Sequence, residues 1–370
     1  MKRWLVIGIT ILSIGLLTAC GRVSLPYARE MGDMALMRTM GIDMEEEQVA
    51  VTISTGRRAV GLQGNTEPPL IMSSTQSSIS EACFVMQGMS DSYLFYGYVD
   101  QFILGETAVQ AGIFPVLDYL ARNVELGLGT KLWATKEMSA KTAIETGGEE
   151  GLEQKLSILQ TDNEIGVAGL TPTAMEVFQR ILEHGSAYLP VLELVQQGEG
   201  QRLIEAGYAI LKEDHLQGYL YGEQTRGLEL LEGKDVSDTL QVQWGQKNAV
   251  VQITGASNAY APIYEDGELK KIQLHCRIAA ELLEFESPIQ QEDLNQIQEM
   301  VEQTEQERME ITLQQLQDWG TDCVTVGSQV EMAAPEGWVR IEQDWERIFQ
   351  EIPIEVTTQV TINRTFGDLA

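Results

Sequence analysis

Hydrophobic and polar residues alternate most clearly in the last third of the chain. Between residues 272 and 278 every second side chain is apolar, which is the period of a half-buried β-strand and places Cys276 in a core. The same period over 354–362 predicts a final strand. Between these strands, residues 291–319 repeat apolar side chains three and four positions apart, which predicts a helix about 43 Å long. Gly320 follows where a left-handed cap would end it.

Two further details of this region are predicted. Residues 302–308 of the long helix are polar on every side, so we expect that turn to extend beyond the core. A shorter helix is predicted over 338–352, with Trp338 and Trp345 on its apolar stripe. We interpret these two tryptophans as core residues in preference to a ligand platform.

The first two thirds mix short strands with short helices. Strands are predicted at 48–54, 96–104, 131–135, 190–195, 207–211 and 216–220. Helices are predicted from about residue 78, at 107–123, from Thr171 as N-cap to about 184, and at 223–232. Residues 61–80, rich in glycine, proline and serine, are typical of a surface loop.

This irregular interleaving favours a multidomain α+β fold. Mixed or antiparallel sheets flanked by helices, with a long C-terminal helix, explain the alternating strands better than a doubly wound parallel sheet. The chain has 370 residues, which favours two or three domains. We place an N-terminal α+β domain at 27–170, a middle α+β domain at 171–255 and a C-terminal α+β domain at 256–370.

The first twenty residues predict export and lipidation. A short basic start precedes an apolar run of about 14 residues, which is too short to span a bilayer and is typical of a signal peptide. The order Leu-Thr-Ala-Cys then resembles a bacterial lipoprotein box. We therefore expect a signal peptide at 1–19, lipidation of Cys20 and a tether at 20–26. Ordinary secretory cleavage beside an incidental cysteine is the alternative.

The net charge limits the partners. With 55 acidic and 25 basic residues the formal charge is −30, which would repel nucleic acid. An anionic membrane leaflet would repel the folded body as well, so we expect that body to stand off the bilayer.

A search for chemistry finds no recognisable constellation, so no catalytic, cofactor-binding or metal-binding residues are predicted. The four cysteines show no zinc spacing, and neither a P-loop nor a G-x-S-x-G or H-E-x-x-H motif occurs. The histidines at 184, 215 and 275 are interpreted as a helix end, a turn and an exposed strand position. Acidic pairs are numerous, and none is distinguished as a glycosidase-like dyad.

Several motifs in order carry a resemblance. They are the lipobox, ALMRTMGID at 35–43, YGYVDQFILGE at 96–106, GYAILKEDHLQGYLYGEQTRG at 207–227, the long helix and WVRIEQDWERIF at 338–349. Together they resemble the Ger(x)C family of spore-germination lipoproteins, the C subunits of nutrient germinant receptors. The resemblance covers nearly the whole mature chain.

The resemblance implies a noncatalytic, lipid-anchored subunit on the outer leaflet of the spore inner membrane. Its partners would be an A-type membrane subunit and a transporter-like B-type subunit. Where family members often show Gly-His-x-Lys, this chain has Tyr98 and Asp100 at the second and fourth positions. If that surface contacts a partner, Asp100 reverses a charge and the partner must differ correspondingly.

The motif at 207–227 is open to two interpretations. The glycines Gly218 and Gly227 would serve turn geometry, and Thr225 and Arg226 a local hydrogen-bonded corner. Alternatively, these four residues contact a partner. For the whole protein the alternative function is an extracytoplasmic solute-binding lipoprotein of an importer, which would be expected to show two similar βαβ lobes.

Overall fold

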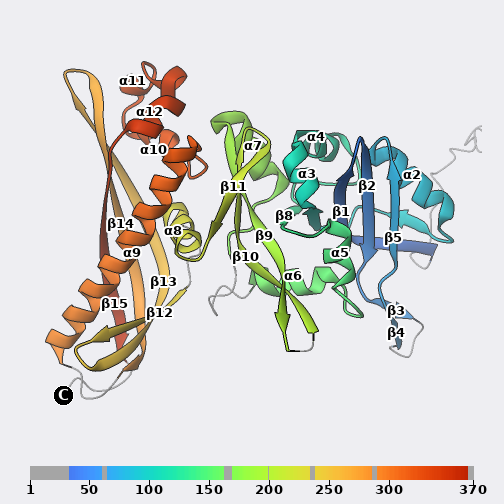
Figure 1. The fold of residues 1–370 in the computed structure, drawn as a ribbon, viewed down its shortest axis with the longest axis horizontal. Coiled ribbons are helices and arrows are strands. Elements are labelled where there is room, and N and C mark those ends of the chain that lie inside the picture. Colours follow the sequence, from blue (N-terminus) through green and yellow to red (C-terminus); the bar gives the residue numbers. More distant parts are fainter. Residues whose placement is uncertain are drawn as a thin grey trace, which may run out of the picture.

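The computed structural model describes residues 33–60, 65–161, 169–198, 200–233, 238–285 and 290–365. These residues form two α+β domains that lie side by side along the long axis of the molecule (Figure 1). A nine-stranded sheet organises the first domain and a four-stranded sheet the second. This arrangement confirms the α+β class and the mixed, helix-flanked sheets that the sequence predicts.

The first sheet has the order β11-β10-β9-β8-β7-β1-β2-β5, and β6 pairs with the beginning of β1. The central strands β1, β7, β8 and β9 are parallel, and antiparallel neighbours extend the sheet at both sides. The strands are β1 (Met34–Glu45), β2 (Gln48–Thr55), β5 (Ile71–Gln76), β6 (Tyr93–Phe95), β7 (Gln101–Leu104), β8 (Lys131–Thr135), β9 (Ser186–Gln197), β10 (Gly200–Lys212) and β11 (His215–Tyr221). The short strands β3 (Arg58–Val60) and β4 (Asn65–Glu67) form a separate ribbon.

Helices cover both faces of the first sheet. Because successive strand residues point to opposite faces, Phe102 and Leu104 contribute to one core and Ile103 to the other. One layer contains α2 (Ile79–Met89), α3 (Glu106–Ala111), α4 (Phe114–Arg122) and α7 (Ala174–His184), and the other contains α5 (Ala140–Glu145) and α6 (Leu152–Thr161).

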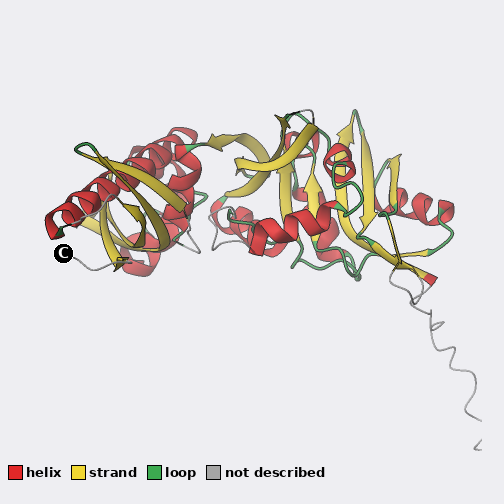
Figure 2. Ribbon diagram, turned by 90° about the horizontal axis from the view of Figure 1, so that it is seen from below, coloured by secondary structure: helices red, strands yellow, loops and turns green. Residues whose placement is uncertain are grey.

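The second domain packs helices against one face of a long, curved sheet (Figure 2). Its strands, in spatial order, are β12 (Asp238–Trp244), β13 (Lys247–Glu265), β14 (Glu268–Phe285) and β15 (Ile354–Thr365). Its helices are α8 (Glu223–Glu232), α9 (Gln291–Trp319), α10 (Val326–Ala333), α11 (Pro335–Trp338) and α12 (Trp345–Glu351), with a 3₁₀ turn at Glu342–Asp344. Cys276 is buried beneath this layer, and His275 on the opposite face is exposed, as the alternation predicts.

The long helix is confirmed from its first residue to its last, and Gly320 caps it with a φ of 64°. The expectation for its polar middle is wrong. Glu305 is 1% exposed and Arg308 8% exposed, because they pair with each other and with charges from other elements. The predicted helix over 338–352 is interrupted by the 3₁₀ turn, although both tryptophans are half-buried and pack against the core.

Several elements of the first domain differ from expectation. The predicted helix over 107–123 breaks at Gly112, whose φ is 102°. A new helix, α4, begins just after it, because Asp214 of a neighbouring turn accepts a hydrogen bond from the Phe114 N–H at 3.0 Å. Of the predicted strand over 96–104, only residues 101–104 form a strand, which is β7. The N-cap of α7 is Thr173 and not Thr171, within a capping box.

The predicted loop over 61–80 also contains strands. Its described part includes β4 and β5, and β5 pairs antiparallel with β2, whose backbone groups need partners. The sheets also divide the chain differently from the boundaries predicted near 170 and 255. Strands β9 to β11 extend the first sheet across residue 170, and residue 255 falls inside β13, so the segment 171–255 contributes strands to both sheets.

Candidate functional site

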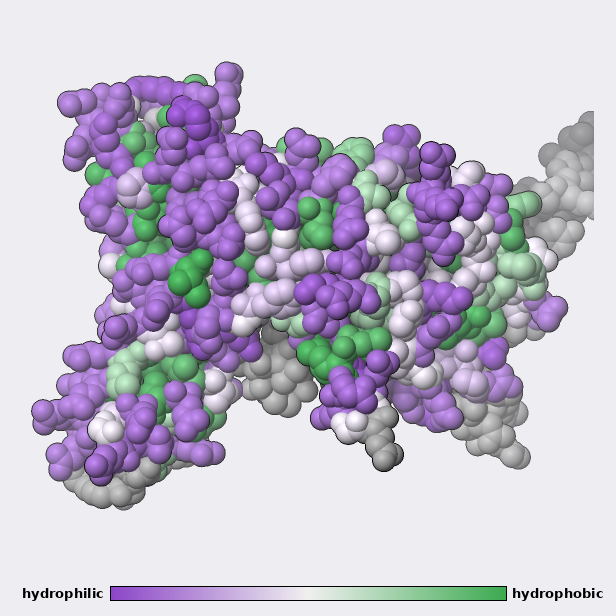
Figure 3. Space-filling view, in the orientation of Figure 1, coloured by the Kyte–Doolittle hydropathy of each residue, from purple (hydrophilic) through white to green (hydrophobic). Residues whose placement is uncertain are grey.

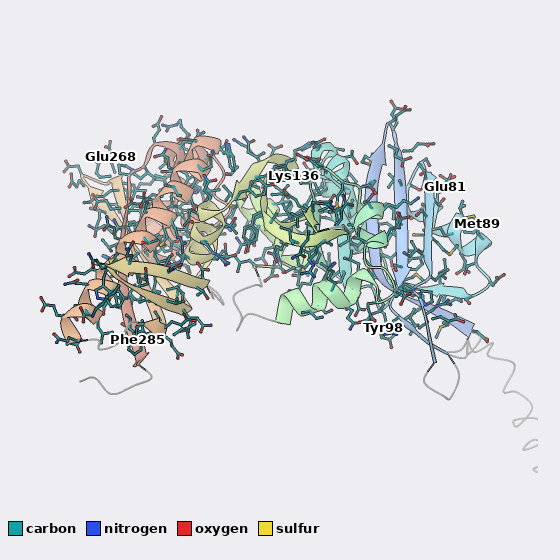
Figure 4. All side chains as sticks on the ribbon, turned by 60° about the horizontal axis from the view of Figure 1, so that its bottom comes forward. Glu81, Met89, Tyr98, Lys136, Glu268 and Phe285 are labelled. Atoms are coloured by element: carbon teal, nitrogen blue, oxygen red, sulfur yellow. The ribbon has the colours of Figure 1, made fainter. Side chains whose placement is uncertain are left out.

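Tyr98 and Asp100 lie in the turn between β6 and β7. Tyr98 is 48% exposed, and its ring meets Phe95 edge-on with centroids 5.8 Å apart. It lies at the surface of the first domain, away from the second (Figure 4). The backbone carbonyl of Asp100 accepts a hydrogen bond from the Lys131 N–H, which ties the turn to the first residue of β8. This turn therefore presents an aromatic side chain on a fixed backbone.

The carboxylate of Asp100 belongs to a small ionic cluster. One nitrogen of Arg38 lies 3.2 Å from Asp100 and 2.6 Å from Glu153. Burial raises the pKa of Asp100, and the Arg38 charge opposes that shift. The second oxygen of Asp100, Oδ1, has no hydrogen-bond partner among the described residues. The position that differs from the family pattern is thus held by this chain's own arginine.

Gly218 lies inside strand β11, so turn geometry does not explain it. A Cβ at this position would lie 2.7 Å from the ring of Trp319 at the end of α9. Glycine therefore lets the last strand of the first sheet approach the second domain. The neighbouring Lys212 adds to this contact by donating to the Trp319 carbonyl at 3.2 Å.

Gly227 lies inside helix α8, where it also permits a close approach. A Cβ there would lie 2.0 Å from Thr312 Oγ1 and 2.2 Å from the Arg308 carbonyl oxygen, so α8 and α9 cross in backbone contact. Thr312 also donates to the Gln224 carbonyl at 3.1 Å. Both glycines of the motif therefore serve packing between elements, which corrects their interpretation as turn residues.

Thr225 and Arg226 make the local hydrogen bonds expected of a corner, and Arg226 extends further. The Thr225 hydroxyl donates to the Leu220 carbonyl at 3.4 Å. Arg226 lies 2.6 Å from Glu229 on the same helix and 3.5 Å from Asp238 at the beginning of β12. The arginine thereby links α8 to the edge of the second sheet.

A buried ionic network continues from this corner. Arg308 of α9 lies 3.0 Å from Asp238 and 2.9 Å from Glu305, and it also pairs with Glu223. Burial raises the pKa of Glu305, and the adjacent Arg308 charge opposes that shift. Two arginines thus hold four carboxylates from α8, β12 and α9 together.

A cleft of about 230 Å³ opens beside the network. The Tyr208 hydroxyl donates to Glu229 at 2.9 Å and accepts from the Leu170 N–H at 2.6 Å. Burial, reinforced by the charge of Glu229, raises the pKa of Glu205 to about 8. The cleft is lined by Gly169, Glu205, Ala206, Gly207, Gly222, Thr225, Arg226 and Glu229. At neutral pH the Glu205 carboxyl group therefore holds a proton, whereas Glu229 is paired with Arg226.

A second contact between the domains involves residues that sequence reasoning missed. Arg180 of α7 pairs with Glu232 through two bonds of 2.8 Å and also donates to the Cys323 carbonyl. Beside it, the buried Asp322 accepts from two backbone N–H groups at 2.7 Å and from Trp345 at 2.9 Å. Burial raises the pKa of Asp322 to about 6. These partners are far apart in sequence, so no local sequence pattern predicts their contacts.

The structure brings together only part of the predicted set. Gly218 and Thr225 lie at the contact between β11 and the second domain, and Arg226 and Gly227 pack α8 against β12 and α9 inside that domain. Tyr98 and Asp100 lie beside β7, four strand positions from β11 in the sheet, or roughly 19 Å. Cys20 lies outside the described residues, so its lipidation stays a prediction.

The chemistry of the described residues is limited. No group of three or more metal-ligating side chains occurs among them. None of the helices they form is long and apolar enough to cross a membrane. His184, His215 and His275 occupy a helix end, the start of a strand next to a turn, and an exposed strand face, in separate parts of the fold.

Two unlike α+β domains, with motif residues at the contact between them, define the class: a two-domain α+β protein. Comparisons with known proteins name the family. Residues 27–194 match a family described as "Spore germination protein N-terminal domain", and residues 206–366 match one described as "Spore germination B3/ GerAC like, C-terminal". The chain belongs to the Ger(x)C family of spore germination proteins.

A solved structure supports the fold. The chain is similar to a protein described as "Crystal Structure of the GerBC protein", with a TM-score of 0.56 and 15% identity, over 88% of this chain and 97% of that one. At that identity the likeness concerns the fold. No curated protein matches the sequence.

Proposed function

We propose that this protein is a noncatalytic, lipid-anchored subunit of a spore nutrient germinant receptor, required for nutrient-triggered germination. It acts by docking with an A-type and a B-type membrane subunit on the outer leaflet of the spore inner membrane. The observation that carries the proposal is the ordered match of both germination family models across residues 27–194 and 206–366.

The placement of the motif residues supports a role in contact. Gly218 and Thr225 connect β11 of the first domain to the second domain, and Gly227 and Arg226 hold α8 against α9 and β12 inside the second domain. A partner that contacts both domains would thus meet a preformed surface, which lowers the ordering cost of binding.

The predicted anchor limits where the body can act. The predicted tether at 20–26 would keep the folded body close to the bilayer. Two acyl chains on Cys20 would give stable membrane attachment. The folded body would therefore act near the bilayer, where exposed loops of membrane subunits are accessible.

The importer alternative receives less support from the domain architecture. A solute-binding lipoprotein is expected to have two similar βαβ lobes. Here one domain has a mixed nine-stranded sheet with helices on both faces, and the other has a four-stranded sheet, mostly antiparallel, with helices on one face.

Assembly is tested by expressing the full-length chain with the A-type and B-type subunits and purifying it from detergent-solubilised membranes. We expect both subunits to copurify, and we expect a Cys20→Ala variant to leave the membrane fraction and to slow germination on nutrients. Triggers that bypass receptors should be unaffected. Normal germination and membrane retention with Cys20→Ala would refute the anchor, and absence of both subunits would refute the receptor assignment.

A further inference from the structure

Helix α7 has a wider apolar arc than the sheet beneath it covers. At about 100° per residue, its buried positions Ala174, Val177 and Ile181 span one side of the helix. Three further apolar residues, Phe178, Leu182 and Met175, follow at about 40°, 80° and 100° from Ala174 on one flank. Leu182 is 63% exposed and Met175 49% exposed. Phe178 is half-buried against the core, so the exposed part of this flank is formed by Met175 and Leu182.

Helix α4 widens the same surface. Its first residue, Phe114, is exposed, and its ring lies 5.9 Å from that of Phe178. Figure 3 shows hydrophobic atoms along the upper edge of the molecule over α4 and α7. We call the four residues Phe114, Met175, Phe178 and Leu182 the α4–α7 patch. Exposed apolar side chains that gather on neighbouring helices in this way are typical of an interaction site.

The helix that carries the patch is rigidly held. Thr173 and Glu176 form a capping box at its first turn, and Gly185 closes it in the left-handed conformation. Arg180, on another side of the helix, is locked to Glu232 by two bonds. Apolar positions at i, i+3 and i+7 on a fixed helix are the anchors that a second helix packs against.

The charges beside the patch decide between possible occupants. The next positions round α7 beyond Met175 are the neutral Gln179 and the exposed Glu183, whereas Asp118 on α4 is already paired with Arg122 at 2.8 Å. A second copy of this chain would bring like charges together, because each copy carries a formal charge of −30. An anionic bilayer would be repelled for the same reason. A positively charged protein segment is favoured.

We propose that the α4–α7 patch is a docking site for an amphipathic, basic helix of the membrane partner. The apolar face of that helix would cover Met175 and Leu182, and its lysine or arginine residues would lie near Glu183. This inference rests on the proposed function, since it assigns the surface through which the subunit contacts its partners.

The test uses the full-length chain expressed with both membrane subunits. A photo-cross-linking amino acid at position 182 should capture a peptide of the A-type or B-type subunit that carries apolar residues at helical spacing and nearby lysine or arginine. A Met175→Asp/Leu182→Asp variant should lower the recovery of the partners at least tenfold. Glu183→Lys should lower it severalfold and weaken its dependence on salt.

A matched control comes from the same domain. Phe84 and Met89 of α2 are 80% and 58% exposed, so Phe84→Asp/Met89→Asp adds the same two charges to another helix. This variant should leave partner recovery unchanged, and unfolding midpoints should match for both double variants. Cross-links to lipid or to a second copy, or full recovery with the patch variant, would overturn the docking site. If the unaltered chain recovers neither subunit, the proposed function fails first and the patch assignment fails with it.

Discussion

The two domains bury their secondary structure in different ways. The first places a mixed sheet between two helix layers, and the clusters that hold it together are apolar on both faces. The second covers one face of its sheet, and its longest helix crosses α8 over a buried cluster of charges. Ionic contacts in the first domain, such as Arg38 with Asp100, are partly exposed by comparison.

Because of this difference, the two domains should lose different amounts of stability when one charged side chain is removed. Water can solvate the partners of a partly exposed arginine, so little stability depends on it. Water cannot solvate a carboxylate that is only 1% exposed, as Glu305 is, so its stability depends on its ion pair. The second domain should therefore be sensitive to changes of charge, and the first to changes of volume.

The largest expected effect is that of Arg308→Met. Removing this guanidinium leaves the buried Glu305 without its cation and Asp238 with only Arg226, 3.5 Å away, and breaking a buried pair in this way costs about 3–5 kcal/mol. The free energy of unfolding of the chain without its signal peptide, from urea titration, measures the loss. Arg38→Met is the matched control and should cost about 1 kcal/mol or less. Equal costs for the two variants would remove the distinction between the domains.

The next largest effect on stability is expected for Gly227→Ala. The added methyl group would meet the Arg308 carbonyl and the Thr312 hydroxyl, so α8 must move away from α9. Overpacking of this kind costs about 1–3 kcal/mol. Urea unfolding of the same chain gives the difference, and a change below about 0.5 kcal/mol would show that the two helices separate easily.

Sequence patterns predict the second domain better than the first. Helix α9 and strands β14 and β15 have one buried face each, so their apolar residues repeat with a clear period. The pattern could not show that Glu305 and Arg308 are buried, because their partners Glu223 and Asp238 come from other elements. Burial of a charge is decided by tertiary contacts that a single helix does not reveal.

In the first domain the local patterns are interrupted by distant residues. Asp214 starts α4 and thereby splits the predicted helix at Gly112, although about a hundred residues separate them in sequence. The role of the glycines in the candidate motif depends on Trp319 and Thr312, which approach from α9 and which no local pattern relates to them. Cys20 and the lipobox remain the sequence prediction to be tested by experiment.

A smaller, pH-dependent effect is expected at the contact between the domains. Because burial raises the pKa of Glu205 to about 8, the folded state retains a proton that the unfolded state releases above its usual pKa of 4.5. Stability therefore falls as the pH rises from 4.5 to 8 and is constant above that. Glu205→Gln removes this dependence, so the variant should match the unaltered chain at pH 4 and be the more stable of the two at pH 9. Parallel stability curves from pH 4 to 9 would contradict the shift.

The smallest expected effect is a gain in the first domain from Gly88→Ala. Gly88 lies within helix α2, and no atom lies within 4 Å of the position that its Cβ would occupy. Alanine loses less backbone entropy in a helix than glycine, so the free energy of unfolding should rise by about 0.5–1 kcal/mol. The same substitution thus stabilises one helix and destabilises the other, since α2 has open space where α8 has a neighbouring backbone. The sign of the change in the free energy of unfolding, from the same urea titration, tests this expectation. A loss of stability with Gly88→Ala would mean that helix α2 packs more closely than its exposed surface indicates.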